Sequence, residues 1–189
     1  MPASEEITSA MNDLAASIAS SVPLAEINSI PAVAATRRAY KLCGKDPNRY
    51  RPSQEQLMRR IVRGLGLYAV NNVVDLGNIL SLSTGCSVGC FDLEKIAGDS
   101  ITVGIGESGE PYEGIGRGAI NIEGMPVLRD AEGAFATPTS DSPRTAISSD
   151  TTRLFTTMHL FEPSLSVDEI LACARRLFPI DDYRLYSAE

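Results

Sequence analysis

The sequence predicts an α+β domain, and two changes in hydrophobic periodicity carry that prediction. Apolar residues recur at helical spacing up to about residue 84, and from about residue 99 the period becomes two. A last helical pattern follows the final strand-like segment. Helices first, strands next and one closing helix favour α+β over an alternating α/β fold. The 189 residues and their 43% hydrophobic content suit one globular domain with a sizeable core.

Four helices are expected before the strands begin. The first covers residues 4–20 and has a serine cap and two glutamates at its start. The second covers residues 31–42, because proline favours a first turn. The third begins at Ser53, which forms a capping-box pattern with Gln56. The fourth covers residues 70–84, with Gly77 allowing close approach.

Alternating patterns predict the strands of the second half. They cover residues 101–105, 119–122, 125–138 and 152–161. The third pattern predicts a hairpin with its turn around residues 130–133. A closing helix begins after Ser166, which forms a second capping-box pattern with Glu169.

No domain boundary is visible, but the beginning of the chain suggests an extension. We expect residues 1–25 to form an N-terminal helical extension and residues 26–189 to form the domain itself. No stretch approaches the ~20 apolar residues that span a bilayer, and the N-terminus lacks a secretory pattern. The four cysteines then suit a reducing compartment. We expect a cytoplasmic protein without a membrane partner.

Charge is distributed unevenly along the chain. The net charge is −7, which by itself argues against nucleic-acid binding, DNA included. Residues 37–63, however, hold nine basic and two acidic residues and carry +7, while the other 8 basic and 22 acidic residues carry −14. Such a block is either a phosphate-facing patch or a solvated helix face. The candidate phosphate-binding residues are Arg37, Arg38, Lys41, Arg59, Arg60 and Arg63.

The segment around residues 104–124 is rich in glycine. Gly114, Gly116 and Gly118 alternate there, which permits backbone conformations that other residues avoid. A phosphate loop needs a helix after it, yet a strand pattern follows, and the Gly-Lys-Ser/Thr sequence is missing. We therefore expect a glycine-lined pocket or tight loops beside a ligand rather than a nucleotide site.

Two polar features complete the candidate ligand site. On the fourth helix, Asn71, Asp75 and Asn78 share one face. Residues 137–145 carry hydroxyls, an aspartate and an arginine, with Pro138 and Pro143 among them, and form either a site or an exposed turn.

The sequence gives little sign of metal or nucleophile chemistry. Cys86 and Cys90 form the single short cysteine pair, and His159 is the only histidine. Zinc sites usually show two such short spacings. Small buried thiols and a structural histidine are the better interpretation, no nucleophile elbow exists, and we expect neither metal nor cofactor.

Three stretches in order resemble one family. They are ATRRAYKLCGKDPNRYRPSQEQLMRRI, YAVNNVVDLGNILSLSTGCSVGCFDLEKI and PTSDSPRTAISSDTTRLF. The second is similar to a segment of the B3/B4 (editing) domain of the phenylalanyl-tRNA synthetase β subunit. The matching positions are Asp75, Asn78, Gly85, Phe91, Asp92, Leu93, Lys95 and Ile96. The resemblance covers roughly residues 30–162 and implies that domain's layered β/β/α fold, with a pocket that receives the mischarged aminoacyl end of tRNA.

The polar residues of the family's pocket are not retained. Its histidine aligns with Gly89, its proline with Ser87, its glutamate falls near Pro143, and its arginine falls at Tyr68. Catalysis is therefore not carried over residue by residue, and whether the chain is an enzyme stays open.

We expect the chain to bind tRNA or aminoacyl-tRNA, with hydrolysis of mischarged aminoacyl-tRNA in trans as a further step, and not to aminoacylate tRNA. The alternatives are a non-catalytic module for an amino-acid-like small molecule and a structural or regulatory subunit. Asp75 is the expected acceptor for an α-amino group. The expected ligand site comprises Tyr68, Asn72, Asp75, Asn78, Gly114, Gly116, Gly118, Ser140, Asp141 and Arg144.

Overall fold

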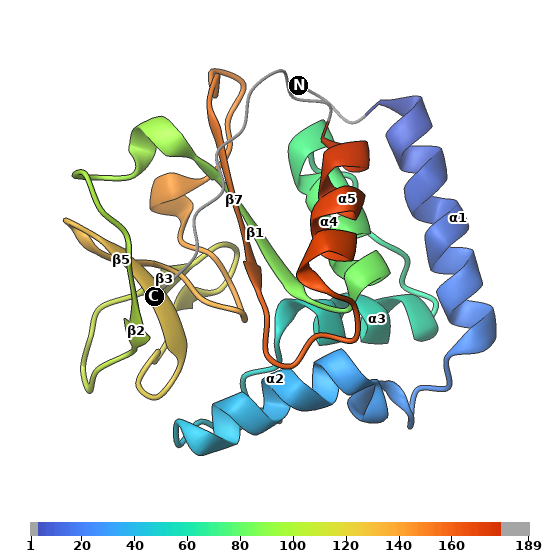
Figure 1. Cartoon of the computed structure of the whole chain (residues 1–189), viewed down its shortest axis with the longest axis horizontal. Helices are drawn as coiled ribbons and strands as arrows, with labels where there is room; N and C mark the ends of the chain where they lie inside the picture. The colour runs from blue at the N-terminus through green and yellow to red at the C-terminus, as the bar shows by residue number, and fades with distance from the viewer. Residues whose placement is uncertain (1–3, 179–189) are drawn as a thin grey trace.

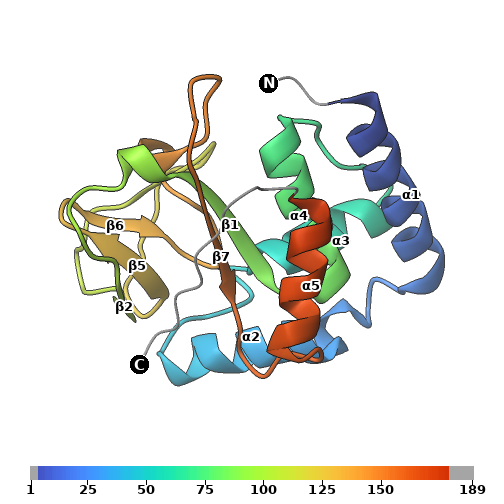
Figure 2. The same ribbon diagram turned by 45° about the horizontal axis from the view of Figure 1, so that its top comes forward.

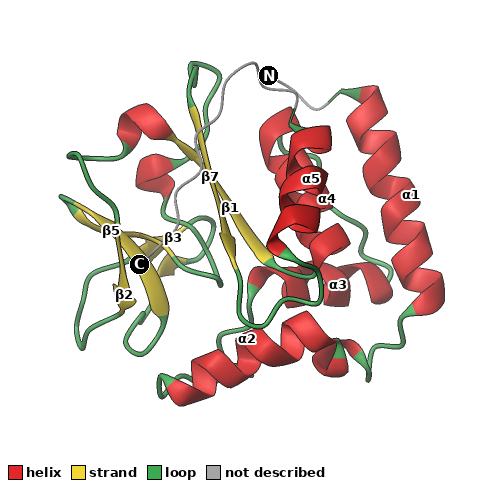
Figure 3. Cartoon of the chain, in the orientation of Figure 1, coloured by secondary structure: helices red, strands yellow, loops and turns green. Residues whose placement is uncertain are grey.

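Helices lie on one side of the molecule and most strands on the other (Figure 1, Figure 3). The structure is a computed structural model and describes residues 4–178. Its helices and antiparallel sheets confirm the predicted α+β class. None of the helices in this described part is long and apolar enough to cross a membrane.

The helices follow the predicted order. They are α1 (Glu5–Ser21), α2 (Pro31–Leu42), α3 (Ser53–Val62), α4 (Asn72–Thr84) and α5 (Val167–Leu177). Short 3-10 turns are η1 (Ile27–Ser29), η2 (Leu93–Lys95) and η3 (Pro143–Thr145). The strands are β1 (Ser87–Asp92), β2 (Thr102–Ile105), β3 (Glu113–Gly114), β4 (Gly118–Ala119), β5 (Pro126–Asp130), β6 (Gly133–Ala136) and β7 (Leu154–His159).

Apolar helix faces build the first core. Val33 of α2, Met58 of α3 and Leu82 of α4 are buried together. Leu14 and Ile18 of α1 pack against this cluster. The helix of the expected N-terminal extension therefore shares its core with the following helices, while the boundary at residue 25 stays a prediction.

Strands β1 and β7 pair antiparallel between the helices and the sheet β2–β5–β6 (Figure 1, Figure 2). On the helical side, a Cβ at Gly77 of α4 would lie only 2.8 Å from Sγ of Cys90. On the other side, Phe91 packs edge-on against Phe135, with 5.2 Å between ring centroids. Both faces of β1 are thus covered.

Local details of the second half differ from the expectation in two places. The predicted hairpin is confirmed as β5 and β6, but the strand predicted at 119–122 is wrong beyond Ala119. Lys45 instead donates hydrogen bonds of 2.7 and 2.8 Å to the carbonyls of Asn121 and Glu123. These carbonyls bind a side chain of the helical half, and Ile122 between them is buried.

One of the two expected capping boxes forms. Ser166 and Glu169 cap α5 reciprocally, as predicted. The capping box predicted at the start of α3 is wrong, because Pro52 occupies the N-cap and makes no side-chain capping bond. The Ser53 N–H donates to Pro138, and the Gln56 amide donates to Thr139. Both groups tie α3 to the loop after β6 instead.

His159 at the end of β7 generates a pH prediction. Its Nε2 is buried without a hydrogen-bond partner, and burial lowers the pKa of this side chain to about 4. The unfolded chain, with an ordinary histidine pKa near 6.5, then takes up the proton first as the pH falls. Stability from the neutral ring is therefore full above pH 6.5 and lost progressively between pH 6.5 and 4.

We expect wild type to lose on the order of 2 kcal/mol more than His159→Gln between pH 7 and pH 4.5. Urea denaturation at several pH values measures this difference, and the non-titrating variant is its own baseline. Parallel pH profiles for the two proteins would contradict the burial of a neutral histidine.

Candidate functional site

The candidate ligand site forms where the loop of residues 137–142 meets the β3–β4 hairpin and β1. The Ile115 N–H donates to the Asp141 carbonyl at 2.9 Å. A Cβ at Gly114 would lie 2.9 Å from Oγ of Ser140. Cys90 lies on β1 beside them: burial and the Asp141 carboxylate raise the pKa of its thiol to about 12. Gly114, Ser140 and Asp141, all predicted from sequence, are thus brought together.

Hydrogen bonds fix the shape of the loop that carries Asp141. Oγ1 of Thr137 accepts the N–H groups of Thr139 and Ser140 at 3.2 and 3.1 Å. The Tyr112 hydroxyl donates to the Ser140 carbonyl at 2.6 Å. Because the neighbouring backbone is held in this way, Asp141 is presented by a rigid turn rather than by a free loop.

The Asp141 carboxyl is the least satisfied polar group of this site. It is half-buried, and no residue from 4 to 178 donates a hydrogen bond to its side chain. Burial alone raises its pKa to about 8. A cation with N–H donors would supply both the charge and the hydrogen bonds that this carboxylate lacks.

Asp75 does not serve as an open acceptor. Its side chain is buried in the first turn of α4 and accepts the Val70 N–H at 3.0 Å. Asn72 Oδ1 accepts the Ser4 N–H at 2.7 Å, and Asn71 caps the helix through the Val74 N–H. The polar face expected on this helix is therefore mostly used to organise the helix start.

The remaining predicted ligand residues lie in different surroundings. Gly116 and Gly118 have φ near +68° and +67° and shape the hairpin tip, where Arg117 reaches Gln56 of α3. Asn78 is half-buried, and the described chain supplies no hydrogen-bond partner for its amide. Arg144 forms a two-fold ion pair with Asp130 at 2.8 Å. It lines a separate hollow of about 560 Å³ with Tyr112 and Ser142.

Two of the six predicted phosphate-binding residues hold a buried acid. The side chain of Glu55 on α3 is fully buried and accepts from Arg37 at 2.9 Å and from Arg59 at 2.7 Å. Arg51 lies 3.7 Å from the same carboxylate. Because a buried carboxylate needs paired charges, Arg37 and Arg59 have a structural task that charge counting did not reveal.

The other four predicted basic residues are more available. Lys41 and Arg63 are exposed, and Arg38 forms an exposed ion pair with Glu162 at 2.6 Å. Arg60 lies over the ring of Tyr68, with 3.7 Å between guanidinium and ring centroid. We define Arg38, Lys41, Arg60 and Arg63 as the basic surface.

The position of the family's histidine is filled. A Cβ at Gly89 would lie 2.5 Å from Cζ of Phe91 and 3.2 Å from Oγ1 of Thr157. A side chain at residue 89 would therefore displace the Phe91 ring, which is fully buried. Ser87, at the position of the family's proline, donates its hydroxyl to Oε1 of Gln54, and the same oxygen lies 3.0 Å from the Pro138 carbonyl.

These features define an α+β domain with a candidate ligand site around Asp141, in which the Phe91 ring occupies the place where the resemblance puts a histidine. The family model described as the B3/4 domain matches residues 35–170, and the chain belongs to this family. It is similar to the phenylalanine–tRNA ligase β subunit of Chlorobium chlorochromatii, at 32% identity over 61% of this chain and 14% of that protein. It is also similar to the same subunit of Symbiobacterium thermophilum, at 34% identity over 43% of this chain and 9% of that protein. The chain thus spans a small part of these relatives.

The buried charge cluster predicts a large effect of Glu55→Ala on stability. Loss of this carboxylate leaves two largely buried arginines without their partner, so we expect unfolding free energy to fall by about 3–5 kcal/mol. Glu132→Ala is a matched control, since Glu132 is exposed and lies 3.4 Å from Arg144; its cost should stay below about 1 kcal/mol. Urea denaturation measures both, and similar small losses would contradict the structural role of Glu55.

Proposed function

We propose that this chain binds the aminoacyl end of an aminoacyl-tRNA, and that Asp141 accepts the α-ammonium group of the aminoacyl moiety. The observation that carries this proposal is the half-buried Asp141 carboxyl, to which no residue of the described chain donates. An α-ammonium group is a compact cation with three N–H donors. It fits an acceptor whose charged form is otherwise poorly stabilised.

Membership of the B3/4 family supports a tRNA-related partner, because the similar proteins are named as phenylalanine–tRNA ligase subunits. The basic surface adds a physical reason, since Arg38, Lys41 and Arg63 are exposed, and exposed lysine and arginine position phosphates without reading sequence. We also take the family's β/β/α layering, a cytoplasmic location and an N-terminal extension over residues 1–25 as parts of the proposal. The expected domain, residues 26–189, ends outside the described residues.

We propose binding without hydrolysis. An ester hydrolase needs a group that positions or activates water, and the Phe91 ring fills the place where the resemblance puts a histidine. Purified protein mixed with tyrosyl-tRNA and phenylalanyl-tRNA should leave the rate of ester loss unchanged. Acceleration that Asp141→Asn abolishes would instead establish hydrolysis in trans.

A free amino-acid-like molecule is the second candidate ligand. Two predicted phosphate-binding arginines are held by Glu55, and the chain carries a net charge of −7. The salt dependence of binding affinity distinguishes aminoacyl-tRNA from a free amino acid as the ligand. Counterion release makes the affinity for RNA fall steeply as the salt concentration rises. Binding of a free amino acid should change little between about 50 and 200 mM salt.

The predicted effect of Asp141→Asn is a loss of affinity for aminoacyl-tRNA. Removal of a charge-assisted hydrogen bond, worth about 1.5–3 kcal/mol, should weaken binding roughly 10- to 150-fold. Deacylated tRNA, which lacks the ammonium group, should bind both proteins equally. Filter binding with both RNAs measures this, with exposed Asp99→Asn as the matched control. Equal loss for acylated and deacylated tRNA would contradict the role given to Asp141.

A further inference from the structure

We propose that Tyr68 and Arg60 form a stacking platform for the unpaired terminal nucleobase of the RNA. This inference rests on the proposed function and adds to it the way in which the end of the RNA is held. At position 68 this chain has a tyrosine where the family has an arginine. The platform is therefore argued from this chain's own residues and their contacts.

The platform is built before any ligand arrives. The Arg60 guanidinium lies 3.7 Å from the centroid of the Tyr68 ring. Its Nη2 donates to the Leu65 carbonyl at 3.1 Å, which fixes the guanidinium against the loop. Tyr68 is nevertheless 67% exposed. One ring face is thus covered by a cation, and most of the remaining side chain is open to solvent.

Two apolar residues close to Tyr68 in the chain are exposed as well. Leu65 and Val70 are 58% and 56% exposed, within five residues of each other along the chain. Single exposed apolar residues are ordinary, but a group of them marks a binding surface. This group is open and has an aromatic ring at its centre.

Charge identifies the occupant as nucleic acid rather than peptide or membrane-like surface. No acidic residue occurs from Arg63 to Val74. Arg60 covers one face of the ring, and Arg63, five residues before Tyr68 in the chain, is exposed. A nucleotide carries a flat base for the ring and a phosphate for the arginines, and sequence-tolerant stacking of this kind recurs in single-strand binding. A stacked base would also shelter the exposed tyrosine ring from water.

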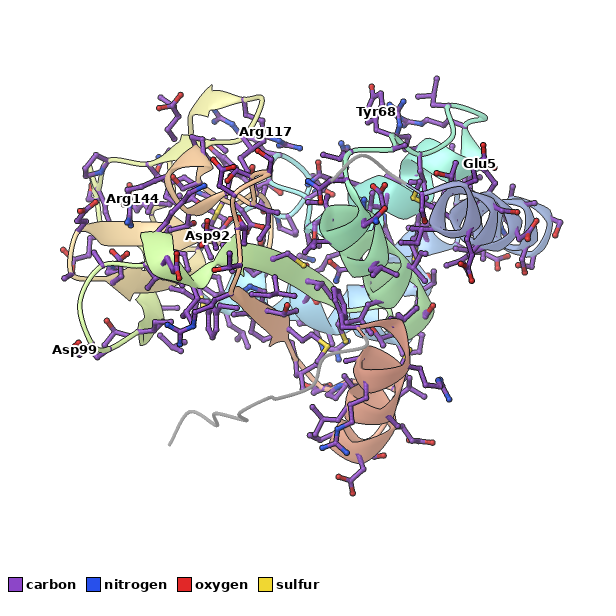
Figure 4. All side chains as sticks on the ribbon, turned by 90° about the horizontal axis from the view of Figure 1, so that it is seen from above. Glu5, Tyr68, Asp92, Asp99, Arg117 and Arg144 are labelled. Carbon is purple, nitrogen blue, oxygen red and sulfur yellow. The ribbon has the colours of Figure 1, made fainter. Side chains whose placement is uncertain are left out.

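The platform lies at the start of α4, close in sequence to the element that borders the candidate ligand site. Tyr68 precedes the cap Asn71, and Gly77 further along this helix packs on Cys90 beside Asp141. Figure 4 shows Tyr68 and Arg117 toward the same edge of the molecule, one on the helical half and one on the strand half. A terminal base on Tyr68 would thus lie at the rim of the half that carries α4.

Tyr68→Trp tests stacking directly, because the native chain contains no tryptophan and the new indole is a single reporter. A short single-stranded RNA should quench its fluorescence, and the same RNA with an abasic 3′ residue should quench it much less. Val103→Trp on β2 is the control, since that position is also exposed but lies on the edge strand of the other half. Its fluorescence should not respond.

Affinity provides the second measurement. Tyr68→Ala should weaken binding of aminoacyl-tRNA roughly 5- to 150-fold, which is the range for loss of one aromatic stacking partner. Tyr68→Phe keeps the ring and should stay within about two-fold of wild type. The comparison of Ala with Phe separates stacking from any effect of the hydroxyl.

The outcomes distinguish this inference from the proposed function. Base-dependent quenching with no effect of Asp141→Asn supports the platform and overturns the aminoacyl acceptor. Asp141-dependent binding that Tyr68→Ala leaves unchanged, with no quenching, overturns the platform and leaves the acceptor in place. Absence of any RNA binding overturns both.

Discussion

The close contact between α4 and β1 is the constraint on which the rest of the molecule depends. Gly77 permits it, because any side chain there would meet the Cys90 thiol. Once α4 lies on β1, the strand joins the helical core on one face to the Phe91–Phe135 contact on the other. The same contact places α4 beside a thiol on which the Asp141 carboxylate also acts. Packing and site geometry therefore share one cause.

A buried carboxylate links helices α2 and α3. Glu55 on α3 is paired with an arginine of α2 and with one of its own helix. Desolvation of three charged groups is offset only while all three remain together. This arrangement explains why the most basic segment of an acidic chain is not simply a binding surface. Part of its charge pairs with Glu55 and holds α2 against α3.

The predictable parts of this fold are those that depend on neighbouring residues. Helices with their own caps and apolar stripes, such as α1 and α5, need only local sequence. Strand β1 was not expected, because SVGCFD has a weak strand pattern and pairs with β7 more than sixty residues later. The strand expected at 119–122 failed for the same kind of reason, since Lys45 from a distant loop binds its carbonyls.

The same distinction holds within the candidate site. Gly114, Ser140 and Asp141 were found because glycine and short polar residues mark tight loops wherever they lie. The acceptor that we propose moves from Asp75 to Asp141, because sequence alone does not show that the Val70 N–H donates to Asp75 while no described residue donates to the Asp141 side chain. Hydrogen-bond satisfaction is a property of the folded chain and not of residue type.

The protonation state of Asp141 bears on the ligand that we propose for it. A carboxyl with a pKa of about 8 is mostly protonated at neutral pH, so the empty site avoids a buried, unpaired charge. An arriving ammonium group favours the ionised form and lowers that pKa, so binding releases a proton. The cost of ionising Asp141 is then met only when a cation is present. The proposed acceptor therefore favours a cationic ligand over an anionic one, because only a cation stabilises the ionised carboxylate.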